Sequence, residues 1–141
     1  MAIDETHAGR TYPPTELYEV SAAKIAEFAA AIGDGNAAYQ GSSPIAPPTF
    51  AAVISATAWE SMFNDSELDI ALRRIVHGDQ RFSYERPLRA GDRVRAALTI
   101  DKVRVRGASD IISSSVRITD EAGNVVCVAA STFFHSREAA S

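Results

Sequence analysis

One segment, Pro48 to Phe63, limits the fold more than any other because it is apolar on almost every side. A proline suits the first turn of a helix, where an amide hydrogen would lack an intrahelical acceptor in any case. A helix that is apolar all round must be buried nearly all round. We therefore expect a central helix over about 48–63, with Val53 and Trp59 largely buried, and the rest of the chain must wrap it.

Four later segments supply the material for this wrapping, because they are rich in Val, Ile, Thr, Tyr and Phe and are bounded by turn residues. They are Arg73–Arg86, Arg93–Arg106, Asp110–Thr119 and Val125–His135. Long strands joined by short turns favour an antiparallel meander, since parallel strands need long crossovers. One apolar helix inside a curled antiparallel sheet is the arrangement of the hot-dog fold, an α+β class. The length of 141 residues fits a single domain, 1–141.

A shorter helix is expected before the central one. Ser21 can cap its first turn, and Ile25, Phe28, Ala29 and Ile32 recur at helical spacing. Gly33 follows where a left-handed C-terminal cap is usual. The loop Gly33-Asp34-Gly35-Asn36 should therefore follow directly from the end of this helix.

Composition narrows the class of protein. The first ten residues are polar and acidic, unlike a secretory signal, and no apolar run approaches a membrane span of about 20 residues. The single cysteine, Cys127, lies in an apolar stretch and excludes an internal disulfide. We expect a cytoplasmic protein that does not act at a membrane.

Charge is distributed unevenly along the chain. The formal net charge of −4 disfavours a nucleic acid partner, yet ten of the 14 basic residues lie between Arg73 and Arg106 with only four acids. Solvated strand faces would explain this segment. A basic rim that attracts an anionic ligand or an acidic protein would explain it too.

The polar residues taken alone predict little chemistry. Asp34 and Asn36 are common turn formers, with side chains that bond to the local backbone. His7 is expected in a mobile N-terminal arm and His135 near a frayed C-terminus, so neither is a good catalytic candidate. His77 lies on a strand beside Gly78, where a bulge is expected. No histidine pair has metal-ligand spacing.

The order of these features adds a resemblance. A helix, Gly-Asp-x-Asn, a short loop, the central helix and then "HGDQRFSYERPLRAGD" (residues 77–92) resemble the MaoC-like dehydratases, or (R)-specific hydratases. The last stretch is similar to FAS1-like dehydratase N-domains. The chain as a whole resembles the non-catalytic subunit of heterodimeric (3R)-hydroxyacyl-ACP dehydratases.

The resemblance implies a fold and a chemistry. The fold is again the hot-dog. In active relatives an aspartate and a histidine hold one water and add it reversibly to a trans-2-enoyl thioester. A backbone N–H at the start of the central helix polarises the thioester carbonyl. This is acid–base catalysis with oxyanion stabilisation and needs no cofactor beyond the carrier.

Two departures from the family pattern concern the catalytic groups. The family's aspartate and asparagine fall on Asp34 and Asn36, but Tyr39 occupies the histidine position. Where relatives have a glycine whose N–H serves the oxyanion, "APPTF" (residues 46–50) places Pro48, which has no N–H. The connection 40–45 is also shorter than in relatives. The resemblance thus implies a degenerate catalytic set of Asp34, Asn36 and Tyr39.

It also implies a substrate-binding set of Pro48, Thr49, Phe50 and His77. The preferred hypothesis is a non-catalytic subunit that binds an acyl-CoA or acyl-ACP thioester beside a catalytic MaoC-like chain, as a homodimer or heterodimer. Three alternatives stay open: an acyl-thioester-binding module without turnover, a hot-dog thioesterase, and an autonomous hydratase that uses Asp34. Glu60 lies at the wrong end of the central helix for the thioesterase.

Overall fold

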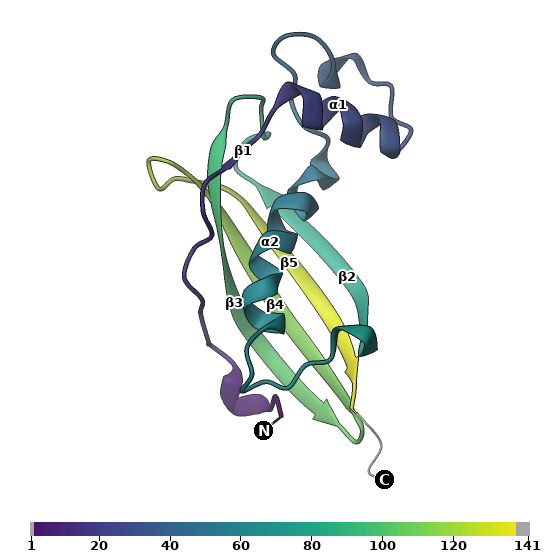
Figure 1. The fold of residues 1–141 in the computed structure, drawn as a ribbon, viewed down its shortest axis with the longest axis vertical. Coiled ribbons are helices and arrows are strands. Elements are labelled where there is room, and N and C mark those ends of the chain that lie inside the picture. The colour runs from purple at the N-terminus through teal and green to yellow at the C-terminus, as the bar shows by residue number, and fades with distance from the viewer. Residues whose placement is uncertain (1, 138–141) are drawn as a thin grey trace.

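A five-stranded antiparallel sheet curls around one long helix (Figure 1), in a computed structural model that describes residues 2–137. The strands are β1 Tyr18–Glu19, β2 Ile75–Tyr84, β3 Arg93–Arg106, β4 Ser109–Asp120 and β5 Val125–Ser136. The α-helices are α1 Ala22–Ala31 and α2 Ala51–Phe63, and short 3₁₀ turns are η1 Glu5–His7, η2 Ala37–Tyr39, η3 Pro48–Phe50 and η4 Leu72–Arg74. The predicted α+β class and the helix-in-sheet arrangement are confirmed.

The central helix begins as the 3₁₀ turn η3 and continues as α2, so its predicted limits are confirmed. Its buried side, with Ile54, Ala58 and Met62, faces the sheet. The opposite side is less covered than the apolar pattern predicts: Val53 and Trp59 are only half-buried. The sheet of a single chain curls over one side of the helix and leaves the other partly open.

The strand order corrects the predicted meander. Strands β3, β4 and β5 follow one another as hairpins, but β2 pairs with β5 at the far edge, in the order β1-β3-β4-β5-β2. The Arg89–Asp92 turn therefore leads into β3 without making a β2–β3 hairpin. The connecting segment 85–92 is held elsewhere, through Ala46 N–H to the Leu88 carbonyl and Gly91 N–H to the Val20 carbonyl. The expected bulge beside Gly78 is confirmed by a register shift between His77 and Asp79.

The two edge regions of the sheet differ in whether another segment bonds to them. Along β3, the N-terminal arm supplies backbone donors from Gly9, Tyr12 and Thr15 before it forms β1. The sequence pattern did not predict this short strand. At the other edge, β2 has no described strand beyond it, and Val76 is 63% exposed beside Leu72 at 66%. One chain thus leaves β2 as an unpaired, partly apolar edge, which is the kind of edge that pairs with another chain.

The first helix follows the sequence pattern closely. The Ser21 hydroxyl accepts a hydrogen bond from Lys24 N–H at 3.1 Å, which caps α1. Ile25 and Ala29 are buried on one face, while Ile32 at the end is 49% exposed. Gly33 then adopts a φ of 70°, the left-handed conformation that ends the helix without steric cost.

Candidate functional site

The polar side chains of the loop after α1 form hydrogen bonds with the loop's own backbone. Asp34 Oδ1 accepts from Asn36 N–H at 3.1 Å, and Asn36 Oδ1 accepts from Ala38 N–H at 2.9 Å, which caps η2. Both side chains are exposed. These are the local bonds of turn-forming residues, so the interpretation of both as turn formers is confirmed.

Tyr39 lies between two surface pockets. It is 8% exposed and lines a pocket of about 460 Å³ together with Asp34 and Gly35. It also lines a second, mainly apolar pocket of about 390 Å³, with Pro48 and Tyr84. We call this second space the helix-start pocket; it is lined by Tyr39, Ile45, Ala46, Pro48, Tyr84, Glu85, Arg86 and Pro87. The structure thus places Tyr39 between Asp34 and Pro48, three of the residues singled out from the sequence.

The start of the central helix is held by a residue that sequence reasoning missed. The Tyr84 hydroxyl donates a short hydrogen bond to the Pro48 carbonyl, and burial raises the pKa of this phenol. Tyr84 lies at the end of β2, on the same alternating face as Gln80 and Phe82. That alternation was the available signal, because it directs every second residue of β2 to the concave side.

The other predicted substrate-binding residues have different settings. Phe50 is fully buried and its ring meets that of Phe28 edge-on at 5.4 Å between centroids. Thr49 is exposed. His77 lies on β2 with its ring against Trp59 and Phe133, at 5.2 and 5.1 Å between centroids. It lines neither of the two pockets around Tyr39, so the structure does not bring His77 to Asp34 and Pro48.

Both histidines near the chain ends, His7 and His135, are buried and hydrogen-bonded, which corrects the expectation that they lie in a mobile arm and a frayed end. His7 is 7% exposed and completes a capping box with Asp4, whose N–H donates to its Nδ1 at 3.0 Å. His135 is 4% exposed and lies near the end of β5. Tertiary contacts fix these residues regardless of their place near the chain ends.

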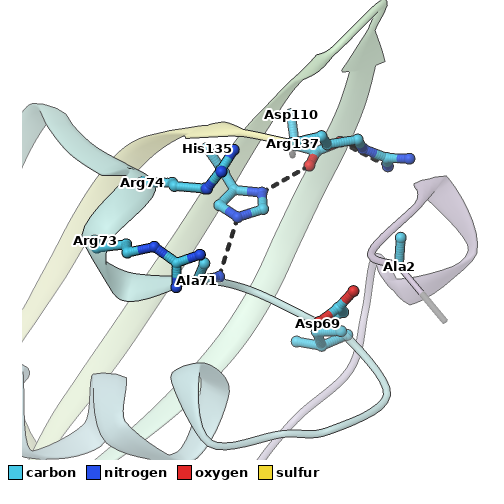
Figure 2. Close-up of a pocket in the computed structure, with 9 residues that line it drawn as sticks. Ala2, Asp69, Ala71, Arg73, Arg74, Asp110, His135 and Arg137 are labelled. Atoms are coloured by element: carbon cyan, nitrogen blue, oxygen red, sulfur yellow. Dashed lines mark hydrogen bonds and ion pairs between the residues drawn. The ribbon is translucent and has the colours of Figure 1, made fainter. Parts of the chain in front are cut away.

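His135 belongs to a buried polar network (Figure 2). Its Nε2 accepts from Ala71 N–H at 3.1 Å, so its Nδ1 carries the proton and donates to Asp110 Oδ2 at 2.9 Å. Arg137 Nε donates to Asp110 Oδ1 at 2.8 Å, and Arg137 Nη2 donates to the Ile3 carbonyl at 2.6 Å. The hydrogen bond to Asp110 raises the pKa of Arg137. The network joins β4, β5, the segment before η4 and the N-terminal arm.

Metal and thiol chemistry find little support in residues 2–137. No group of three or more His, Cys, Asp or Glu side chains in this part of the chain is placed to hold a metal ion. Cys127 is fully buried, and burial raises its pKa to about 11. A thiol in this state is a poor nucleophile at neutral pH. Within the same residues, no helix is long and apolar enough to cross a membrane.

Sequence comparisons identify relatives over most of the chain. Residues 6–129 match the family described as "FAS1-like, dehydratase domain region". A UPF0336 protein of Cutibacterium acnes is 49% identical over 137 residues, which is 97% of this chain and 96% of the relative. A UPF0336 protein of Streptomyces coelicolor is 43% identical over 138 residues, which is 92% of each chain.

Solved structures share the architecture. A chain of the HadBC (3R-hydroxyacyl-ACP dehydratase) complex from Mycobacterium tuberculosis is 25% identical, with a TM-score of 0.81 over 95% of this chain and 99% of that one. A chain of the ChsH1–ChsH2 complex from the same organism gives a TM-score of 0.67 at 16% identity, over 93% of this chain and 86% of that one. At that identity the second likeness shows the fold alone. The predicted hot-dog fold is confirmed.

Proposed function

The chain belongs to the FAS1-like dehydratase domain family, hot-dog proteins of the hydratase and dehydratase type, and from this premise we propose that it is a non-catalytic subunit. In this proposal it pairs with a MaoC-like chain that supplies the catalytic aspartate and histidine. The pair hydrates trans-2-enoyl thioesters, or dehydrates (3R)-hydroxyacyl thioesters, in fatty-acyl metabolism. This chain contributes binding surface for the acyl group.

The observation that carries the proposal is that Tyr39 and Pro48, which stand where active relatives have their histidine and their glycine, both line the helix-start pocket. Tyr39 thus stands where active relatives have the histidine that exchanges protons with the water, and it supplies a phenol in place of an imidazole. Pro48 offers no N–H to a developing oxyanion. The loss of one such donor costs roughly 2.7–4 kcal/mol of transition-state stabilisation, about 10²–10³ in rate. A water held at Asp34 would therefore lack its histidine partner, and the thioester carbonyl would lack the N–H donor that polarises it.

The helix-start pocket supports a binding role all the same. Its lining is mainly apolar, and its volume of about 390 Å³ is in the range of ligand pockets. Beyond it, the half-covered side of α2 carries the small residues Ala52 and Ala56. An acyl chain that enters by this pocket could extend along α2 once a second subunit covers that side.

Two features support a partner subunit. No strand among residues 2–137 pairs with the outer edge of β2, and the adjoining side of α2 is only half-buried, so a second chain that extends the sheet at β2 would cover both. HadBC and ChsH1–ChsH2, whose chains share this fold, are themselves complexes. The proposed partner has the same fold and carries the intact Gly-Asp-x-Asn-Pro-x-His loop.

The test compares the activity of the isolated chain with its activity in complex with a MaoC-like partner. We expect the purified protein to hydrate crotonyl-CoA and longer 2-enoyl-CoA substrates negligibly. Co-expressed with a MaoC-like chain from the same genome, it should form a stable and active complex. Replacement of the partner's catalytic aspartate should abolish that activity, while Asp34→Ala in this chain should leave it unchanged.

Two results would overturn the proposal. Turnover by the isolated chain that is lost in Asp34→Ala would identify an autonomous hydratase. Tight binding of an enoyl thioester by the isolated chain, with no MaoC-like chain able to join it, would identify an acyl-thioester-binding module.

A further inference from the structure

The helix-start pocket is lined by two phenols that differ in the hydrogen bonds they already make. Both Tyr39 and Tyr84 line this pocket of about 390 Å³. Tyr39 is the last residue of η2 and Tyr84 the last residue of β2, so the two side chains come from separate elements. A phenol hydroxyl can donate one hydrogen bond and can also accept. The bonds that each hydroxyl already makes therefore decide what it offers to a ligand.

Tyr84 offers an acceptor. Its hydroxyl donates to the Pro48 carbonyl oxygen, which ties the end of β2 to the start of the central helix. Burial, and then the neighbouring Cys127, raises the pKa of this phenol, so it keeps its proton at neutral pH. Its single proton is thus engaged by Pro48, and a remaining lone pair of the oxygen is what Tyr84 can present to a ligand.

Tyr39 offers a donor. It is 8% exposed, and within residues 2–137 its hydroxyl has no hydrogen-bond partner. Polar groups of residues as buried as this one are nearly always hydrogen-bonded, so an O–H without a protein partner at a pocket indicates a ligand-binding group. Burial fixes the ring, and the O–H is available to a bound molecule.

The other polar side chains of the pocket are less suited to hold a ligand. The Arg86 guanidinium is bound by Asp92 through hydrogen bonds of 2.8 and 3.1 Å. Glu85 is exposed, and its charge repels an anionic group. The rest of the lining is apolar and consists of Ile45, Ala46, Pro48 and Pro87. The best fit is therefore a neutral, mainly apolar group with one polar atom that accepts from Tyr39 and donates to Tyr84.

An alcohol has this property, because one hydroxyl both accepts and donates. Among acyl thioesters, a 3-hydroxyacyl chain carries such a hydroxyl, whereas a 2-enoyl chain has no polar atom at the same carbon. We propose that the helix-start pocket binds the hydroxyl of a 3-hydroxyacyl thioester between Tyr39 and Tyr84, and so holds the hydroxyacyl form in preference to the enoyl form. The thioester part of this ligand rests on the proposed function, and the hydroxyl rests on the two phenols.

The experiment measures ligand binding to the isolated chain by isothermal titration calorimetry. The ligands are (3R)-3-hydroxybutyryl-CoA, crotonyl-CoA and butyryl-CoA. Coenzyme A is common to all three, so its contribution cancels in a ratio of dissociation constants. Two neutral hydrogen bonds separate the first ligand from the others, so we expect its Kd to be lower by about tenfold or more. In Tyr39→Phe this preference should nearly vanish, while the Kd of butyryl-CoA stays unchanged.

Two further variants complete the series. Tyr84→Phe removes the acceptor and should also reduce the preference, but it breaks the bond to Pro48 as well. If this variant does not fold, Tyr39→Phe carries the test alone, because it breaks no side-chain hydrogen bond within residues 2–137. The matched control is Tyr18→Phe, which removes a phenol of β1 that does not line the helix-start pocket and should keep the wild-type ratio.

Several results would overturn the hydroxyl site. They are equal Kd values for hydroxybutyryl-CoA and butyryl-CoA in the wild type, no binding of any of the three ligands, and a preference that survives in Tyr39→Phe. An equal loss of affinity for all three ligands in Tyr39→Phe would make this residue structural. Activity of the complex judges the proposed function separately. An active complex without the hydroxyl preference overturns only the hydroxyl site, whereas a Tyr39-dependent preference in a chain that forms no active complex overturns only the subunit role.

Discussion

Replacement of Asp110 by asparagine should be costly for stability. The carboxylate is fully buried and accepts from His135 Nδ1 at 2.9 Å and from Arg137 Nε at 2.8 Å. An asparagine keeps the shape but loses the charge, and its NH₂ group faces one of these donors. A hydrogen bond to a charged group contributes about 1.5–3 kcal/mol, and a donor left unsatisfied in the interior costs about 1–3 kcal/mol. Arg137 is 31% exposed, so water can solvate its guanidinium and offset part of the loss at this side chain. We expect a loss of about 2–4 kcal/mol in the free energy of unfolding.

The measurement is urea unfolding followed by circular dichroism, at one protomer concentration for all variants because association shifts apparent stability. The matched control is Glu121→Gln. It removes one charge from an ion pair with Arg93 at 3.2 Å in which both side chains are about half exposed, and such pairs contribute about 0–1 kcal/mol. If Asp110→Asn lowers the free energy of unfolding no more than this control does, and the dependence of that free energy on urea concentration is unchanged, the network does not stabilise the fold as described.

Three further outcomes are expected. Because burial raises the pKa of Cys127 to about 11, iodoacetamide at pH 8 should label it far more slowly in the native protein than in urea, and equal rates would contradict its burial. The hydrogen bond from Tyr12, together with Arg10, lowers the pKa of Asp65 below 3.8. Asp65→Asn should therefore destabilise the protein at pH 6, and this deficit should shrink as the pH falls below about 3.8, whereas a constant deficit would exclude the linkage. Tyr39→His should not give the isolated chain hydratase activity, since Pro48 still lacks an N–H, and measurable hydration of crotonyl-CoA by this variant would show that no such donor is needed.

Much of the fold could be predicted from local composition. The apolar segment 48–63 predicted the central helix, and segments rich in β-branched and aromatic residues between turn residues predicted β2, β3, β4 and β5. The partner of β2 could not be predicted in this way, because alternation shows which face of a strand is buried but not which strand lies beside it. β1 spans two residues, too few to produce a pattern.

The candidate site, too, could be predicted from the sequence only in part. Tyr39 and Pro48 were found because motif spacing places them, and the structure brings both to the helix-start pocket. The burial of His7 and His135 was missed because position near a chain end was taken as a sign of mobility, although contacts with distant segments decide it. For His135 a signal existed: Ser131, Phe133 and His135 alternate on the concave face of β5. No spacing rule would have predicted the bond from Tyr84 to Pro48, which joins residues 36 positions apart.

The N-terminal arm has a consequence for the order of events in folding. Arg10 and Tyr12 bond to Ile100 and Leu98, nearly ninety positions later, while β3, β4 and β5 join through neighbouring hairpins. Closure of such a long loop is entropically costly, so the hairpins should form early and the arm should dock late. Until it docks, β3 is an open edge, as β2 is in the single chain. During synthesis the N-terminal arm is therefore made first but docks on β3 last. Between these two events the open edge of β3 is most exposed to pairing with strands of other chains, which leads to aggregation.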